Sequence, residues 1–303
     1  MIVLLALDDS IYSDLAFASV QHRGWNPDTK FVLCTVIERI CLSSGNRIKP
    51  EDQEAWREKM DAALDVKVKK LQETHPDCTV EKLIEFGVPG ERILAAADRI
   101  GAADIVLGSH GRTGFSHYLL GSVAEQVSSC TPCTVEIVKS PKLFVHSPEV
   151  LPHNLNALLE QKKILLVVTG TDDGKSAEKW VLESKWETDQ KISLITVCGT
   201  KKSKALTLIG KSKTNPQKTV SATEYHQSQI AKFALISRQV TDSIRIGDAA
   251  EEILDYADKI EANLIVMGAD LLSVGQDGAG TIASAVAAGS RCSVRVVKER
   301  STL

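Results

Sequence analysis

Apolar and polar positions along this chain follow two alternating patterns. Short, almost wholly apolar runs, such as VLLAL at 3–7 and DIVLG at 104–108, are typical of parallel strands covered on both faces. Between such runs, apolar residues recur at i, i+1, i+4 and i+7, which gives a helix one apolar face. The first half of the chain therefore predicts strands near residues 2–8, 31–37, 80–86, 103–108 and 134–139, and helices near residues 11–22, 50–74, 90–100 and 122–130. This alternation predicts a doubly wound parallel sheet with right-handed crossovers.

The same pattern occurs a second time. FGVPGERILAAADRIGAADIVLGSHG around Gly87 matches IGDAAEEILDYADKIEANLIVMGADL around Gly247, 160 residues further on. TVEIVK at 134–139 corresponds to SVRVVK at 293–298, 159 residues further on. Near-constant offsets over both halves indicate a tandem duplication. The sequence therefore predicts an α/β protein with two tandem, doubly wound, five-stranded, Rossmann-like parallel-sheet domains, over residues 1–140 and 161–303.

A proline-rich segment separates the two halves. Residues 140–156 hold three of the nine prolines of the chain. Because proline removes a backbone donor and disfavours helix, this segment predicts a surface linker, which we assign to residues 141–160.

Composition narrows the classes of function. A net charge of −3 gives no electrostatic reason to expect nucleic acid or an anionic membrane as the main partner. No apolar run approaches the roughly 20 residues that cross a bilayer. The N-terminal MIVLLALDDS has no basic segment before it and is cut short by Asp8 and Asp9, so it predicts a strand and not a signal peptide. Seven cysteines, an odd number, fit a reducing compartment, and we expect a cytoplasmic protein.

The loop after the fourth predicted strand carries the candidate chemistry. Ligands of doubly wound sheets bind beyond the carboxyl ends of the strands, where the strand order reverses. In GSHGRTGFSHYLLGSVAEQV, the glycines Gly108, Gly111 and Gly114 would let the backbone approach a ligand and take positive φ values. Arg112 adds a charged donor. The sequence thus favours an anion site in this loop.

The pair Gly121–Ser122 opens the helix that follows this loop. Free N–H groups at a helix start, together with the positive end of the helix dipole, bind phosphate. A ligand-free explanation stays open, since Ser122 and Glu125 have the S-x-x-E spacing of a capping box.

A family resemblance favours the phosphate hypothesis. The pattern Gly108-x-x-Gly111, nine residues, then Gly121-Ser122 resembles the ATP-binding signature of the universal stress protein family. VLLALDDS at 3–10, FGVPGERIL at 86–94 and TPCTVEIVK at 131–139 are also similar to segments of that family. With the second copy included, the likeness covers nearly the whole chain, and it implies the fold of the adenine nucleotide alpha hydrolase-like proteins.

The resemblance also implies roles for individual residues. Asp8 and Ala6 would hold the nucleoside end of ATP, Val36 would offer main-chain groups to the adenine, and Leu107 and Gly108 would lie against the ribose. A further set would surround the phosphates, largely through backbone N–H groups: His110, Gly111, Arg112, Gly121, Ser122 and Val123. Mg²⁺ would accompany the nucleotide. The last strands of the two domains would pair within the chain, and two chains would be able to form a homodimer.

The second copy lacks several of these parts. Thr169 stands at the position of Asp8, Leu271 at that of Gly111, and Ser284 at that of Glu125. A leucine side chain where the backbone must meet phosphate would obstruct the ligand. We therefore expect the second domain to be a structural pseudo-subunit with a degenerate site.

Cys130-Thr-Pro-Cys133 has the spacing of a redox motif but lies where a helix ends. The helix dipole there raises a thiol pKa, and no second CxxC completes a zinc site, so both cysteines are expected to be structural.

The leading hypothesis is a cytoplasmic stress-response regulator that responds to ATP or a related adenylate through its N-terminal domain. The alternatives are a slow ATPase or nucleotidyl transferase that uses the same loop, and a nucleotide-free scaffold. No nucleophile or general base is marked, so we assign no catalytic residue and no metal-ligating residue, and expect slow hydrolysis at most.

Overall fold

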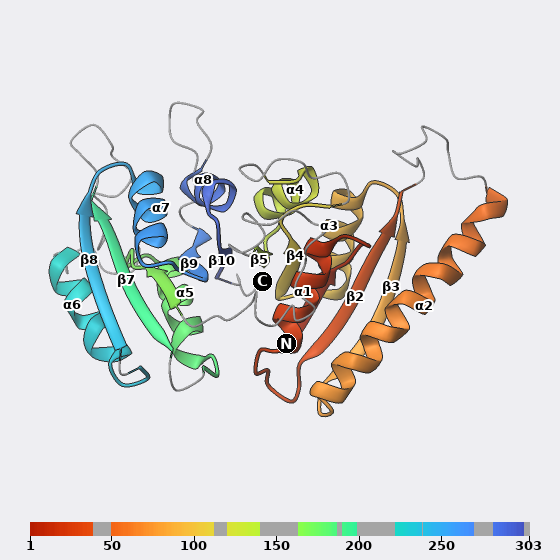
Figure 1. Cartoon of the computed structure of the whole chain (residues 1–303), viewed down its shortest axis with the longest axis horizontal. Coiled ribbons are helices and arrows are strands. Elements are labelled where there is room, and N and C mark those ends of the chain that lie inside the picture. Colours follow the sequence, from red (N-terminus) through yellow and green to blue (C-terminus); the bar gives the residue numbers. More distant parts are fainter. Residues whose placement is uncertain are drawn as a thin grey trace. The chain divides into compact units, whose positions relative to one another are not determined.

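The computed structural model describes residues 1–38, 50–111, 120–139, 163–186, 190–198, 222–237, 239–269 and 281–299 (Figure 1). Arg112, Gly114, Leu271 and Gly280 lie outside these ranges. The described residues divide into two compact units, one that ends at Val138 and one that follows it.

The first unit alternates strands and helices without exception. Its elements are β1 (Ile2–Ala6), α1 (Ile11–Gln21), β2 (Lys30–Ile37), α2 (Pro50–Thr74), β3 (Thr79–Phe86), α3 (Pro89–Ile100), β4 (Asp104–Gly108), α4 (Ser122–Cys130) and β5 (Thr134–Val138). The strands are parallel and lie in the order β3-β2-β1-β4-β5. Helices α1 and α2 pack on one face and α3 and α4 on the other, so the predicted doubly wound fold is confirmed.

The order of the strands reverses next to β1. Strand β1 pairs with β2 on one side and with β4 on the other, and Ala6 lies opposite both Cys34 and Leu107. The chain therefore leaves the ends of β1 and β4 in opposite directions, toward α1 and α4. This switch point is where ligands of doubly wound sheets bind.

The second unit repeats this topology. Its elements are β6 (Lys163–Val167), α5 (Asp172–Glu183), β7 (Lys191–Cys198), α6 (Ala222–Phe233), β8 (Gln239–Ile246), α7 (Ala249–Lys259), β9 (Leu264–Gly268), α8 (Ile282–Gly289) and β10 (Ser293–Val297). Its parallel strands lie in the order β8-β7-β6-β9-β10, which is that of the first unit. The predicted tandem duplication of the fold is thereby confirmed.

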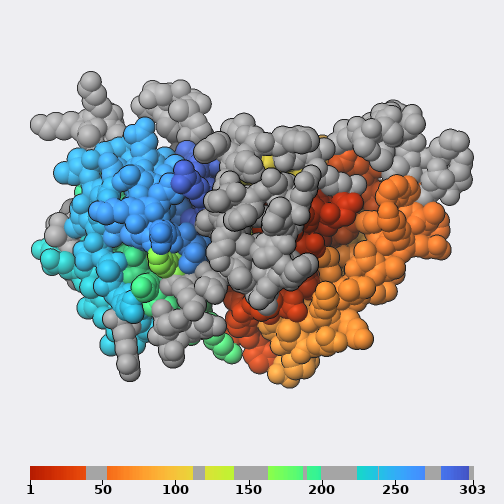
Figure 2. Space-filling model, in the orientation of Figure 1, coloured from red at the N-terminus to blue at the C-terminus, as the bar shows by residue number. Residues whose placement is uncertain are grey.

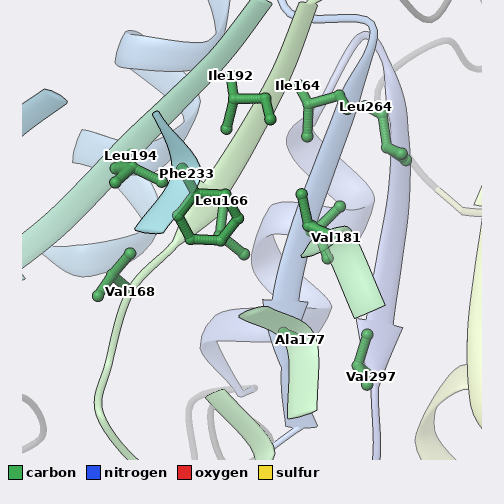
Figure 3. Packing of buried hydrophobic residues seen from close by; sticks show 11 residues of the cluster. Ile164, Leu166, Val168, Ala177, Val181, Ile192, Leu194, Phe233, Leu264 and Val297 are labelled. Atoms are coloured by element: carbon green, nitrogen blue, oxygen red, sulfur yellow. The ribbon is translucent and has the colours of Figure 1, made fainter. Parts of the chain in front are cut away.

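Each unit has an apolar core against its own five strands. In the second unit, Leu166 of β6, Leu194 of β7 and Phe233 of α6 pack together (Figure 3), and Trp180 and Trp186 lie against this cluster. In the first unit, Leu4, Leu33 and Ile105 are fully buried on adjacent strands. These are the apolar runs that predicted the strands.

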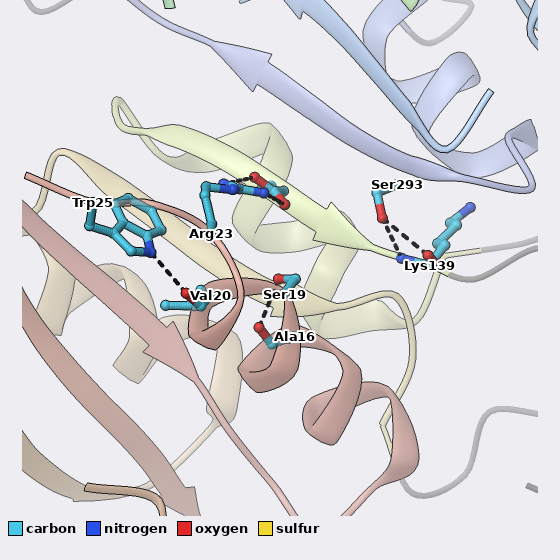
Figure 4. A network of polar contacts seen from close by, with 8 residues as sticks. Ala16, Ser19, Val20, Arg23, Trp25, Lys139 and Ser293 are labelled. Carbon is cyan, nitrogen blue, oxygen red and sulfur yellow. Dashed lines mark hydrogen bonds and ion pairs between the residues drawn. The ribbon is translucent and has the colours of Figure 1, made fainter. Parts of the chain in front are cut away.

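A buried ion pair fastens the segment after α1 to β5. Nη1 and Nη2 of Arg23 donate to the two oxygens of the Glu136 carboxylate, at 2.7 and 2.5 Å. The Glu136 side chain is fully buried and that of Arg23 nearly so. Figure 4 shows this pair beside Trp25, whose indole N–H donates to the Val20 carbonyl. Removal of either partner would leave the other as an unpaired buried charge, which is strongly destabilising.

The helices that cover the outer strands β3 and β8 differ between the copies. Helix α2 has 25 residues and presents most of them to solvent (Figure 2), whereas α6 has 12. Within the described ranges, no helix is long and apolar enough to cross a membrane.

Candidate functional site

The turn after β1 holds Asp8 in a network of hydrogen bonds. Its Oδ1 accepts from the backbone N–H of Ser10 at 2.9 Å and from the Ser10 hydroxyl at 2.6 Å. The backbone N–H of Asp8 donates to Ser13 Oγ at 3.0 Å. Ser10 is also the N-cap of α1, because its Oγ accepts from the N–H of Ser13. The carboxylate of Asp8 is therefore tied to the start of α1 through one oxygen.

The loop after β4 packs directly against the start of α4. The N–H of Gly121 donates to the Ser109 carbonyl at 2.9 Å. A Cβ at Gly121 would lie 3.2 Å from the Cα of His110, closer than most Cβ contacts in proteins. Glycine at 121 thus lets the first turn of α4 lie against the backbone of residues 109–111.

Gly111 brings this loop to Asp8. A Cβ at Gly111 would lie 3.1 Å from Asp8 Oδ2, and Gly111 itself is exposed. The backbone of the β4 loop therefore meets the second carboxylate oxygen of the β1 turn. Asp8, His110, Gly111 and Gly121 gather at the switch point of the sheet.

The start of α4 has no side-chain cap. The N-cap residue is Gly121, and no side chain caps this helix in the described part of the chain. Ser122 is the first helical residue, so it does not occupy the N-cap position that a capping box requires. The predicted capping box of Ser122 and Glu125 is therefore wrong. The N–H groups of Ser122, Val123 and Ala124 precede the first helical hydrogen bond, from Glu125 to Gly121, and lie at the positive end of the helix dipole.

The remaining predicted site residues lie on three adjacent strands. Ala6 and Leu107 are buried, and they pair across β1 and β4. Val36 is half-buried near the end of β2, and Gly108 is the last residue of β4. The structure thus places the predicted residues that it describes along the carboxyl ends of β1, β2 and β4 and at the start of α4.

The backbone conformation of the loop glycines differs from the prediction. Among the described residues, the glycines with positive φ are Gly87, Gly101 and Gly170, so the positive φ expected of Gly108 and Gly111 is wrong. A Cβ at Gly108 would come within 2.6 Å of the backbone carbonyl carbon of Tyr12. The close packing of β4 on α1 is therefore sufficient reason for glycine at 108.

Sequence reasoning did not select Tyr12, Ser10 or Ser13. The Tyr12 ring lies 5.0 Å from that of His110, centroid to centroid, and His110 Nδ1 lies 3.1 Å from Ser109 Oγ. Burial raises the pKa of the Tyr12 phenol. The available signal was the D-x-S spacing of Asp8 and Ser10 before a helix, which is typical of an N-cap.

The second copy fills the corresponding space with its own side chains. Thr169, the counterpart of Asp8, is buried, and its Oγ1 lies 2.7 Å from that of Thr171. Gly174 replaces Ser13, and a Cβ there would overlap the Thr169 hydroxyl. At the start of α8, Thr281 is the N-cap, and its Oγ1 accepts from the N–H of Ser284 at 3.1 Å.

The two cysteines of the CxxC segment differ in their surroundings. Cys130 is the last residue of α4 and is exposed, whereas Cys133 is buried and its thiol donates to the Ala102 carbonyl. Within the described ranges, no three His, Cys, Asp or Glu side chains form a group that could hold a metal ion.

The fold and its switch point define a tandem Rossmann-like α/β protein with a candidate anion site in its first copy. The chain belongs to the universal stress protein family, whose model matches residues 1–139 and 160–298.

Individual relatives agree with this assignment. The chain is 39% identical over 95 residues to the universal stress protein MJ0531 of Methanocaldococcus jannaschii, a match that covers 31% of this chain and half of that relative. It is 31% identical over 109 residues to the universal stress protein Slr1101 of Synechocystis, covering 35% of this chain and 99% of that relative. A universal stress protein from Archaeoglobus fulgidus shares the fold, with a TM-score of 0.64 over 98% of this chain and 96% of that one, at 21% identity.

Proposed function

We propose that the first copy binds ATP or a related adenylate, and that the protein is a cytoplasmic, ATP-responsive regulator of the stress response. The observation that carries this proposal is the contrast between two helix starts. The N-cap of α4 is Gly121, which has no side chain to cap the helix, whereas α8 is capped by Thr281. Uncapped N–H groups at a helix start are suited to phosphate oxygens, because they supply donors and a positive partial charge.

The assignment of individual residues follows the family signature. Asp8 and Ala6 contact the nucleoside, Val36 the adenine, and Leu107 and Gly108 the ribose. His110, Gly111, Arg112, Gly121, Ser122 and Val123 surround the phosphates. The gathering of Asp8, Gly111 and Gly121 at the switch point supports this set.

Mg²⁺ is expected to bind through the nucleotide. Mg²⁺ keeps several of its waters and is usually held by substrate phosphates together with one or two carboxylates. Asp8 is the carboxylate nearest to Gly111 in the site. A single carboxylate does not suit a metal site built from protein ligands alone, but it does suit a Mg²⁺ ion that the phosphates also hold.

The second copy has a supporting role in this proposal. Residues 161–303 act as a structural pseudo-subunit, joined to residues 1–140 by the linker at 141–160. Pairing of the two last strands and formation of a homodimer remain predictions. We assign no catalytic residue, and we expect hydrolysis of ATP to be slow at most.

Calorimetry with ATP and Mg²⁺ tests the proposal. The wild type should bind one ATP per chain, and Gly121→Val should weaken binding at least tenfold, because the new Cβ would push α4 away from His110. Gly280 stands at the position of Gly121 in the second copy, 159 residues further on, and Gly280→Val should bind ATP like the wild type. Equal affinity of wild type and Gly121→Val would reject the assigned loop, and a wild type that binds no ATP would favour the scaffold.

A further inference from the structure

We propose that Ser10 and Ser13 are positioning residues that aim the carboxylate of Asp8 at the ligand. This inference rests on the proposed function, because it concerns the same site. Both serines are buried, and both bind Asp8 rather than facing the loop of β4.

The two serines hold Asp8 from two sides. Ser10 donates to Oδ1 through its hydroxyl and its backbone N–H, at 2.6 and 2.9 Å. Ser13 Oγ accepts from the backbone N–H of Asp8 at 3.0 Å. Because both the backbone and one carboxylate oxygen are fixed, the side chain of Asp8 has little freedom to rotate.

The second oxygen of Asp8 points to the candidate site. Oδ2 is the atom nearest to a Cβ built at Gly111, and no residue in the described part of the chain donates a hydrogen bond to it. A carboxylate repels phosphate but accepts hydrogen bonds from hydroxyl groups. Oδ2 is therefore suited to a ribose hydroxyl of the nucleotide.

The second copy separates the structural role of these residues from the positioning role. Thr171 replaces Ser10 and still caps its helix, since its Oγ1 accepts from the N–H of Gly174 at 3.1 Å. Gly174 replaces Ser13 and has no hydroxyl, yet α5 forms. The fold therefore needs a hydroxyl at the N-cap but none at the position of Ser13. The second copy lacks the Ser13 hydroxyl together with the carboxylate, since Thr169 replaces Asp8 and its Oγ1 lies 2.7 Å from that of Thr171.

The test compares ATP with 2′,3′-dideoxy-ATP by calorimetry. Ser13→Ala should weaken the binding of ATP about fivefold, the effect of one lost hydrogen bond, while the dideoxy analogue binds as it does to the wild type. Ser19→Ala is the matched control. Ser19 lies in the same helix and donates to the Ala16 carbonyl (Figure 4), away from Asp8, so this variant should bind both nucleotides like the wild type.

A second pair of variants distinguishes the positioning role from a loss of folding. Ser10→Thr keeps the hydroxyl, as the second copy does with Thr171, and should restore the ribose selectivity that Ser10→Ala lowers. If Ser13→Ala binds ATP like the wild type, or loses both nucleotides equally, the positioning role is overturned. A wild type that binds no ATP would instead overturn the proposed function.

Discussion

The two copies share one fold but differ in the side chains that they place at the switch point of the sheet. In the first, Asp8 is held with one carboxylate oxygen toward Gly111, and the N-cap of α4 is Gly121, which has no side chain. In the second, Thr169 bonds to Thr171 and Thr281 caps α8. The same backbone thus either leaves polar groups available or satisfies them internally. The comparison teaches that a few side chains, and not the fold, decide which copy is suited to a ligand.

The largest expected effect concerns a position where the copies carry opposite charges. Glu136 of β5 corresponds to Arg295 of β10, 159 residues further on. Arg295 is buried 4.1 Å from the Trp180 ring, whereas Glu136 pairs with Arg23. Glu136→Gln removes the negative charge and leaves a cation buried, so it should destabilise the first copy by about 3–5 kcal/mol in urea unfolding.

Glu81→Gln is the control for this prediction. Glu81 pairs with Lys30 at 2.7 Å, but both side chains are at least one-third exposed, so its loss should cost about 1 kcal/mol or less. A Glu136→Gln variant as stable as Glu81→Gln would show that the buried pair does not hold β5 in place.

The next largest expected effect is on the pH dependence of stability, at a position where one copy has a buried carboxylate and the other a buried apolar residue. Glu178 of α5 corresponds to Phe17 of α1. Burial raises the pKa of Glu178 from an ordinary 4.5 to about 7, although hydrogen bonds from Tyr225 and the charges of Lys232 and Lys175 oppose the shift. The folded state therefore holds this proton more tightly than the unfolded state does.

Stability of the second copy should consequently fall as the pH rises. The contribution of Glu178 is fully present below pH 4.5 and is lost as the pH rises through about 7, a change of about 3 kcal/mol. Thermal unfolding of wild type and Glu178→Gln between pH 5 and 8 measures it, and the variant should lack this component. If both proteins show the same pH dependence, Glu178 is not the group responsible.

The smallest expected effects are those of substituting two nearby glycines, Gly108 at the end of β4 and Gly111 in the loop that follows it. Gly108→Ala places a Cβ against the Tyr12 backbone and should cost about 1–3 kcal/mol of stability. Among the residues that the structure describes, a Cβ at Gly111 meets only Asp8 Oδ2, so Gly111→Ala should change stability by no more than about 0.5 kcal/mol while the affinity for ATP falls several-fold. Urea unfolding and calorimetry on both variants test this division. Loss of stability in Gly111→Ala, with ATP binding retained, would contradict it.

The fold was predictable from the sequence because buried parallel strands leave wholly apolar runs. Strands such as DIVLG at 104–108 and the repeat itself needed no tertiary information. Glycine spacing also selected the loop that meets Asp8. The reasons for individual residues were less visible. The N-cap of α4 lies at Gly121 rather than Ser122, where glycine allows close packing against His110, and glycine at 108 is required by the backbone of Tyr12. Contacts between residues so far apart in the chain leave no local pattern.

A crystal structure of the full chain grown with ATP and Mg²⁺ tests the central claim most directly. We expect nucleotide density in the first copy alone, with phosphate oxygens at the N–H groups of Ser122 and Val123 and the ribose near Asp8. Density only in the second copy, or in neither copy, would contradict the account.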